Sequence, residues 1–168
     1  DYEAALLAAN ARVTIVGPDG EQRVPVAEFV RGACATCLDD AQLITGMEIP
    51  DWDGKRCGGY AKKKEPASGG AVVGVATDLL CASSDGDRVT SARIAVNGIQ
   101  ESAVRLTGAE DALDGSRLTP ATVDRAVDAA GSSLEPSDLL DNKKASAEYR
   151  HTLLGPYARR SIDKAVSE

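Results

Sequence analysis

The chain has 168 residues, of which 43% are hydrophobic, and a formal net charge of −7. This length and composition allow one compact domain or two small ones, and the acidic balance does not favour binding to nucleic acid or to an anionic membrane. The longest apolar stretch, residues 71–82, is too short to span a bilayer, which takes about 20 residues.

The start of the chain gives two further expectations. The residues Asp1-Tyr2-Glu3 carry no basic signal-peptide start, so we expect a cytoplasmic protein. The first residue is not methionine, and the chain opens almost at once in a helical pattern. We therefore expect a fragment of a longer protein.

The first fifty residues predict a helix over residues 2–9, a hairpin of strands 13–16 and 23–26, a helical turn over 27–32, and a strand over 43–49. Asp1 occupies the position of a helix N-cap. The hairpin is indicated by β-branched runs on either side of a Gly-Pro-Asp-Gly turn. Pro50 ends the last strand.

The middle third predicts a polar connection over 51–59, strands over 60–64 and 88–96, a strand or buried helix over 72–81, and a turn over 84–87. Periodicity alone does not decide between strand and helix for the apolar run at 72–81. We expect this run to pair with the strand that follows as an antiparallel hairpin. Trp52 lies in the connection, and we assign it no function.

The last third changes to a helical pattern. Thr107 and Glu110 have the spacing of a capping box before a short helix, and Thr119 with Pro120 begins a second helix. A third helix is expected from Ala145, broken or kinked at Pro156. Its apolar stripe consists of Ala158, Ile162, Ala165 and Val166. Strands followed by helices predict an α+β fold, with helices on one face of an antiparallel sheet.

Two features have the residue types of a chemical site. Cys34 and Cys37 form a C-x-x-C, which suits a redox pair or half of a zinc site. A structural zinc site would prefer a second C-x-x-C or a histidine pair, so we favour ordinary thiols and predict no metal site. His151, the single histidine, has no nucleophile or carboxylate partner evident in the sequence, and we predict no catalytic residue in this chain.

Four stretches in order carry a family resemblance: DYEAALLAANARVTIV at the start, residues 26–50 with Phe-x-x-Gly leading to LITGMEIP, Tyr60-Ala61-Lys62, and the tail with RIAVNGIQESAVRLTGAEDALDG and AEYRHTLLGPYARRSIDKAV. Together they resemble the C-terminal portion of the FAD-binding medium subunit of molybdenum hydroxylases of the carbon monoxide dehydrogenase and xanthine dehydrogenase family. The Ala-Glu-Tyr-Arg segment is the best single marker. The resemblance covers nearly the whole chain.

The resemblance implies a division of the chain into two domains. Residues 1–53 would be the C-terminal part of the FAD-binding domain. Residues 54–168 would form a small antiparallel sheet with a helical layer, like the C-terminal domain of the carbon monoxide dehydrogenase flavoprotein. No glycine-rich phosphate-binding loop is present in the sequence, so the fragment alone should bind FAD poorly.

The resemblance also implies an oxidoreductase subunit that transfers electrons. Electrons would come from molybdopterin on a large subunit, pass through [2Fe–2S] clusters on a small subunit to FAD on this subunit, and leave to an external acceptor. The assembly would be a dimer of heterotrimers. The alternatives are a non-catalytic subunit-assembly module and a small cysteine-based zinc or redox protein.

Three cofactor-binding positions follow from the resemblance. Asp1 matches an aspartate that hydrogen-bonds the cofactor, Ile44 an apolar residue against the flavin region, and Lys62 a lysine whose ammonium contacts polar groups of the cofactor. A cation near a flavin is one means by which a protein tunes this cofactor. Without the family, these residues would be an N-cap, a core strand residue and an exposed lysine.

One segment departs from the family pattern. Soon after the lysine, family members carry charged and aromatic residues, whereas this chain has Glu-Pro-Ala-Ser-Gly-Gly at 65–70. The path of this segment is therefore not given by the resemblance. We also expect structural roles for Arg105 and Glu110, at the strand-to-helix connection, and for Tyr149 and Arg150, as a packing and interface pair.

Overall fold

The structure is a computed structural model that describes residues 1–52, 54–82 and 85–167, with the backbone alone for 85–87. The first lobe contains α1 (Tyr2–Ala8), β1 (Arg12–Gly17), β2 (Gly20–Pro25), α2 (Val26–Phe29), β3 (Val30–Gly32), β4 (Ala35–Thr36) and β5 (Leu43–Glu48). The rest contains β6 (Lys55–Lys64), β7 (Ala71–Ala82), β8 (Asp85–Asn97), β9 (Val104–Arg105), α3 (Thr107–Leu113), α4 (Pro120–Gly131), η1 (Pro136–Asp138) and α5 (Ala147–Ser167). No helix within the described ranges has the length and apolar character needed to cross a membrane.

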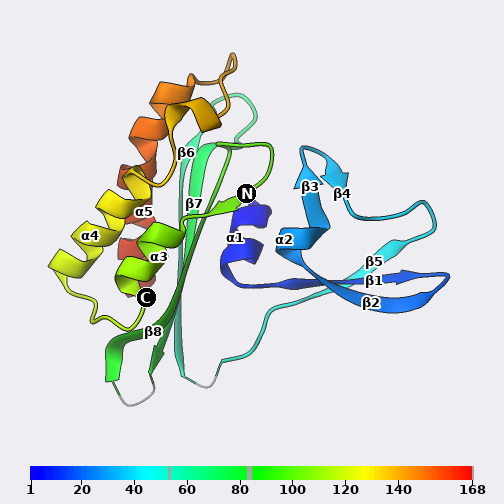
Figure 1. Cartoon of the computed structure of the whole chain (residues 1–168), viewed down its shortest axis with the longest axis horizontal. Coiled ribbons are helices and arrows are strands. Elements are labelled where there is room, and N and C mark those ends of the chain that lie inside the picture. Colours follow the sequence, from blue (N-terminus) through cyan, green and yellow to red (C-terminus); the bar gives the residue numbers. More distant parts are fainter. Residues whose placement is uncertain (53, 83–84, 168) are drawn as a thin grey trace.

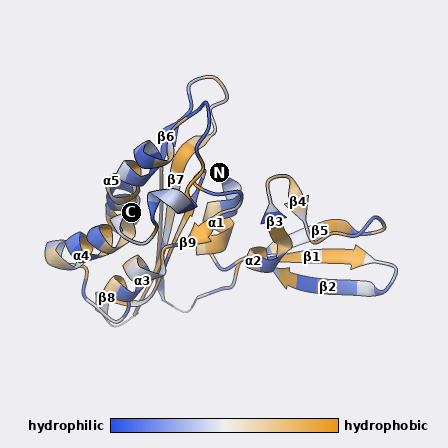
Figure 2. Cartoon of the chain, turned by 45° about the horizontal axis from the view of Figure 1, so that its top comes forward, coloured by the Kyte–Doolittle hydropathy of each residue, from blue (hydrophilic) through white to orange (hydrophobic). Residues whose placement is uncertain are grey.

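The first lobe is built on an antiparallel sheet with the strand order β2-β1-β5. The predicted hairpin is confirmed: Gly17 pairs with Gly20 across its turn. Val13 and Ile15 of β1 are buried against Val26 and Phe29, at the two ends of α2. Figure 2, coloured by hydropathy, shows that β1 is hydrophobic and β2 is largely hydrophilic.

The second sheet is antiparallel, with the order β6-β7-β8-β9, and β6 forms one edge. The predicted polar connection over 51–59 is wrong from Lys55 onward, because β6 already pairs there with β7. The predicted turn over 84–87 lies partly outside the described residues, and from Asp85 the chain is in β8. One glycine of the expected linker, Gly59, has a packing role instead. A Cβ on Gly59 would lie 2.0 Å from the Ser161 carbonyl oxygen, so only glycine lets α5 approach β6 this closely.

Helices cover both faces of this sheet, as Figure 1 shows: α3, α4 and α5 lie on one side and α1 on the other. On the α1 side, Ala4 and Ala8 pack against Ala76 of β7 and Ala95 of β8. Burial on both faces explains the mostly apolar composition of β7, and the apolar run is a strand. The α+β class is confirmed, with α1 as an additional cover that was not predicted.

The helix α5 continues through Pro156, so the predicted break is wrong, while the alternative of a kink at this residue stays a prediction. Proline costs this helix one backbone hydrogen bond, but packing compensates, because Leu154, Ala158 and Ile162 on either side of it are fully buried. Ala165 also lies in the core as predicted. Val166 was wrongly placed on the buried stripe, and its side chain is 45% exposed.

The predicted capping box at Thr107 and Glu110 is wrong. Leu106 is the N-cap residue of α3, and the buried carboxylate of Glu110 accepts instead from the backbone N–H of Ile94 (2.8 Å) and from the Arg105 guanidinium. Arg105 and Glu110 thereby join β9, α3 and β8, which confirms their structural role. The N-cap at Thr119 is confirmed by a bond from the Thr122 N–H.

Candidate functional site

Asp1 and Lys62, two of the three predicted cofactor residues, meet in the structure although 61 positions separate them. The Lys62 ammonium donates to the Asp1 carboxylate and also to the Gly69 carbonyl at 2.9 Å. Lys62 lies on β6, and Asp1 immediately precedes α1, which packs on the same side of the sheet. The fold therefore places a cation and an anion side by side at the start of α1.

Asp1 occupies the N-cap position of α1. The predicted N-cap position of Asp1 is therefore confirmed, but its side chain does not supply the capping hydrogen bond. The carboxylate is engaged by Lys62 through Oδ2. A carboxylate has about four acceptor positions, so Asp1 keeps capacity for a further donor.

The loop after Lys62 is a tight turn, which resolves the segment that departs from the family pattern. The Glu65 carboxylate accepts from the backbone N–H groups of Ala67 and Ser68. The Glu65 N–H bonds the Gly70 carbonyl (2.8 Å), and the Gly69 N–H bonds the Glu65 carbonyl (2.9 Å). Gly69 has φ +73°, a conformation that favours glycine. Hydrogen bonds from Ser68 and from the two N–H groups lower the pKa of Glu65 to about 2.

Ile44 does not join this pair. It lies on β5, opposite Ile15 of β1, in the sheet of the first lobe. Its side chain is 44% exposed, so the interpretation of Ile44 as a core strand residue is wrong. The structure leaves this side chain available for contact with another group.

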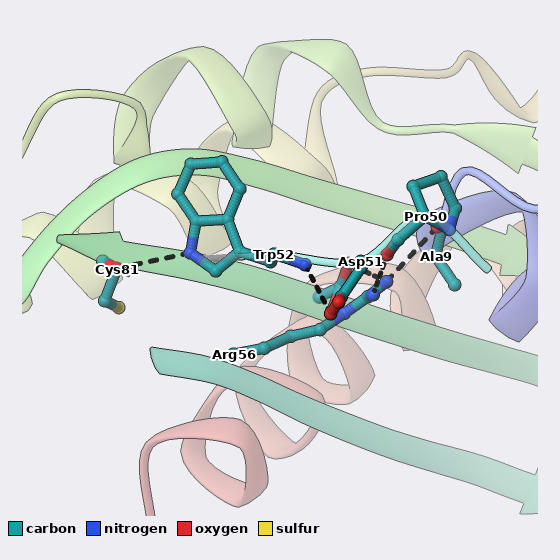
Figure 3. Close-up of polar contacts among 7 residues, drawn as sticks. Ala9, Pro50, Asp51, Trp52, Arg56 and Cys81 are labelled. Carbon is teal, nitrogen blue, oxygen red and sulfur yellow. Dashed lines mark hydrogen bonds and ion pairs between the residues drawn. The ribbon is translucent and has the colours of Figure 1, made fainter. Parts of the chain in front are cut away.

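A second polar cluster was missed from the sequence. Arg56 of β6 forms a bidentate pair with the buried Asp78 of β7, at 2.8 Å for both contacts. The same guanidinium donates to the carbonyls of Pro50 (2.8 Å) and Ala9 (3.2 Å), as Figure 3 shows. Arg56 thus joins the second sheet to the end of α1 and to the connection after β5.

Two signals in the sequence pointed to this cluster. Asp78 is a carboxylate inside a buried apolar run, and such a group requires a partner. The alternation of β6 places Arg56 and Lys62 on one face of the strand, but this was hidden because β6 was predicted to begin only at Tyr60. Trp52 lies on the connection after β5, and its Nε1 donates to the Cys81 carbonyl at 3.4 Å.

An open cleft of about 780 Å³ lies between α1 and the edge strand β6, with Ala5, Ala9, Gly58, Tyr60 and Lys164 among its lining residues. Burial raises the pKa of Tyr60, while a hydrogen bond to Asn97 at 3.3 Å acts in the opposite direction. Lys164 of α5 donates to the Tyr60 carbonyl at 2.9 Å. The cleft borders both the Arg56 cluster and the strand that carries Lys62.

The cysteines and His151 lie in different parts of the fold, and the four cysteines are free thiols. Cys57 and Cys81 lie in the buried core, and Cys34 is exposed. Within residues 1–52, 54–82 and 85–167, no group of three or more His, Cys, Asp or Glu side chains is placed to hold a metal ion. His151 lines a shallow groove between α4 and α5.

Arg150 is a structural residue that the sequence indicated only in part. Its side chain is 2% exposed. The guanidinium donates to the carbonyls of Leu140, Val72 and Gly98 and to the side chain of Asn142. The expected packing role is confirmed for Arg150, whereas Tyr149 beside it is 44% exposed.

Comparison with protein families decides where this chain belongs. The family of the CO dehydrogenase flavoprotein C-terminal domain matches residues 59–165, which is more than half of the chain. The chain belongs to this family. The FAD-binding domain of molybdopterin dehydrogenases matches residues 1–52. The predicted family resemblance is confirmed.

The most similar curated proteins and solved structures agree with this family. The chain is 27% identical to the carbon monoxide dehydrogenase medium chain of Hydrogenophaga pseudoflava, over 98% of this chain and 55% of that protein. It is 31% identical to the nicotine 6-hydroxylase medium subunit of Paenarthrobacter nicotinovorans, over 98% of this chain and 56% of that protein. The chain therefore spans about half the length of these relatives.

The fold agrees as well. A solved carbon monoxide dehydrogenase from Hydrogenophaga pseudoflava superimposes with a TM-score of 0.86 at 27% identity, over 99% of this chain and 56% of that chain. Quinoline 2-oxidoreductase from Pseudomonas putida 86 superimposes with a TM-score of 0.83 at 23% identity, over the same shares of both chains, and so supports the fold alone.

Proposed function

We propose that this chain is the C-terminal portion of an FAD-binding medium subunit of a molybdenum hydroxylase, with the flavin bound beside Lys62 and Asp1. One observation carries the proposal: the fold of a family member brings these two residues together from 61 positions apart. FAD, when bound, would supply the electron-accepting chemistry.

The residues present fit such a group. Lys62 has three N–H donors, of which two are directed to Asp1 and Gly69. Its side chain is 28% exposed and that of Asp1 is 33% exposed, so both remain within reach of a ligand. An ammonium held at a fixed place favours the negative charge that a flavin acquires on accepting electrons.

We propose three further features of this chain. Ile44, with its half-exposed side chain, would contact the flavin region from the first lobe. The boundary between the two domains would lie at residues 53/54, of which Asp53 is outside the described residues. We also propose a cytoplasmic location for the assembled protein.

The proposed partners follow from what the relatives are. Homologues of this chain are medium chains or subunits of carbon monoxide dehydrogenase and nicotine 6-hydroxylase. We place a small iron–sulfur subunit and a large molybdopterin subunit beside this chain, in a dimer of heterotrimers. Electrons would enter from the iron–sulfur clusters and leave to an external acceptor.

The test uses the full-length parent protein, co-purified with its partners. We expect flavin absorption bands, together with iron and molybdenum in the same particle. Lys62→Ala should lower the flavin midpoint potential by about 30 mV, which is a tenfold change in a two-electron equilibrium. Lys63→Ala, which removes the same charge one residue further along β6, should change it much less.

A colourless particle without flavin would overturn the proposal and leave the subunit-assembly module as the better interpretation. Equal shifts in Lys62→Ala and Lys63→Ala would mean that only overall charge matters. That result would remove Lys62 from the flavin site while leaving flavin binding itself in place.

A further inference from the structure

We propose that the turn formed by residues 65–70 is a positioning element for Lys62, which holds the ammonium through the Gly69 carbonyl and so fixes where the positive charge lies. The inference rests on the proposed function and extends it to a segment that departs from the family pattern. It names Glu65 and Gly69 as residues that act on the flavin only through Lys62.

The turn provides Lys62 with a second acceptor. The Gly69 carbonyl accepts from the Lys62 ammonium at 2.9 Å. The lysine ammonium is carried on a flexible four-carbon stem, so the side chain alone does not fix the position of the charge. A second acceptor opposite Asp1 therefore restricts the ammonium to a position between the two.

The Glu65 carboxylate helps to hold the turn closed, and the closed turn determines where the Gly69 carbonyl points. It accepts from the N–H groups of Ala67 and Ser68, and the Ser68 hydroxyl oxygen in turn accepts from the Gly70 N–H at 3.2 Å. Two backbone bonds between residue 65 and residues 69 and 70 close the turn. With its ends tied, the turn presents Gly69 to Lys62 in one arrangement.

A different explanation is that the turn only connects β6 to β7. Many hairpin loops do no more, and their composition is free to vary. A mere connection would not affect the freedom of one lysine or the potential of a bound flavin. These two quantities therefore separate the two explanations.

The first measurement is the rate at which each lysine is modified by an amine reagent in the full-length protein freed of flavin, followed by mass spectrometry. We expect Lys62 to react several-fold more slowly than Lys63, which is exposed on the same strand. Glu65→Ala should raise the rate at Lys62 several-fold and leave that at Lys63 unchanged. Glu65→Gln, which keeps one oxygen acceptor, should give an intermediate rate and serves if Glu65→Ala does not fold.

The second measurement is the flavin midpoint potential of the assembled protein in a double-mutant cycle. Glu65→Ala should shift the flavin equilibrium about two- to threefold in the direction of Lys62→Ala, and it should have no further effect when Lys62 is already alanine. Unchanged modification of Lys62 in Glu65→Ala would overturn the inference. The inference would also be overturned if Glu65→Ala shifted the flavin potential equally in the presence of Lys62 and in the Lys62→Ala variant.

The outcomes also separate this inference from the proposed function. If Glu65→Ala frees Lys62 but Lys62→Ala leaves the potential unchanged, the turn does position the lysine and the proposed flavin contact fails. If Lys62→Ala shifts the potential and Glu65→Ala affects neither quantity, the flavin contact stands and the positioning role is overturned.

Discussion

The guanidinium of Arg56 and the carboxylate of Asp78 face each other across β6 and β7, joined by two contacts of 2.8 Å. Asp78 is buried, and Arg56 also donates to the carbonyls of Pro50 and Ala9, so this pair joins β6 and β7 to the end of α1 and to the connection after β5. It adds to the packing of α1 on β7 and β8, which also joins the N-terminal segment to this sheet.

Arg56→Ala should therefore destabilise the protein clearly. Removing one partner of a buried pair leaves an uncompensated charge, which costs about 3–5 kcal/mol. The partial exposure of Arg56 places our expectation near the lower end, about 3 kcal/mol in the free energy of unfolding by urea. Arg23→Ala is the matched control, because its pairs with Glu21 and Glu48 are exposed and such pairs contribute about 0–1 kcal/mol. Equal losses in the two variants would contradict this account.

Gly59→Ala should weaken the contact between α5 and β6. The added Cβ would meet the Ser161 carbonyl oxygen at 2.0 Å and the Ala165 nitrogen at 2.8 Å, both on the α5 backbone. Overpacking of this kind costs about 1–3 kcal/mol or more. Gly58→Ala, one residue earlier, has nothing within 4 Å and should change stability by no more than about 0.5 kcal/mol. Urea midpoints of the two variants give a direct comparison, and a harmless Gly59→Ala would show that α5 shifts readily.

Arg150→Lys should be destabilising although it keeps the charge. Lysine cannot reproduce the planar fork that reaches the four acceptors of Arg150, so buried carbonyls lose their donors, at about 1–3 kcal/mol for such a group. Thermal unfolding should show a lower midpoint. Arg159→Lys is the control, since its partner Asp124 is exposed. An unchanged midpoint for Arg150→Lys would mean that water replaces the missing donors.

The turn at residues 65–70 should respond to acid. The folded-state pKa of Glu65 is about 2, below its ordinary value of 4.5. A depressed carboxyl pKa stabilises the fold above the ordinary value, and this contribution is lost as the pH falls from about 4.5 towards 2. Amide hydrogen exchange at Ala67 and Ser68, corrected for intrinsic rates, should speed up across this window. The dependence should disappear in Glu65→Gln, and its persistence there would assign it to another group.

Local sequence patterns predicted the elements well where neighbouring residues alone determine the backbone conformation. The hairpin around the Gly-Pro-Asp-Gly turn and the cap at Thr119 need only neighbouring residues, and both were predicted correctly. The family was also within reach, because its motifs lie in order along the chain.

Features that depend on distant partners were not predictable. Gly58 and Gly59 looked like a linker, because the helix that Gly59 accommodates lies about a hundred residues later. Glu110 looked like a capping residue, but Arg105 and the Ile94 N–H compete for its carboxylate. Pro156 looked like a helix break, but burial of the residues around it outweighs one missing bond.

The candidate site, too, could be predicted from the sequence only in part. Asp1 and Lys62 came from the family pattern, and their contact could be found only in three dimensions. The role of Gly69 and Glu65 had no signal at all in the sequence, because it depends on the closed turn. Arg56 had two indirect signals, the carboxylate of Asp78 inside an apolar strand and the alternation of β6, and the second was hidden because β6 was predicted to begin only at Tyr60.

The lysines of the edge strand have one more consequence. β6 carries Lys55, Lys62, Lys63 and Lys64, and the ammonium of Lys164 already occupies the Tyr60 carbonyl. Exposed sheet edges are templates for uncontrolled pairing, and lysine side chains are a common protection against it. A strand from another molecule would have to displace Lys164 and bring its own backbone into a row of positive charges. The same residues would thus hinder aggregation of the protein through this edge.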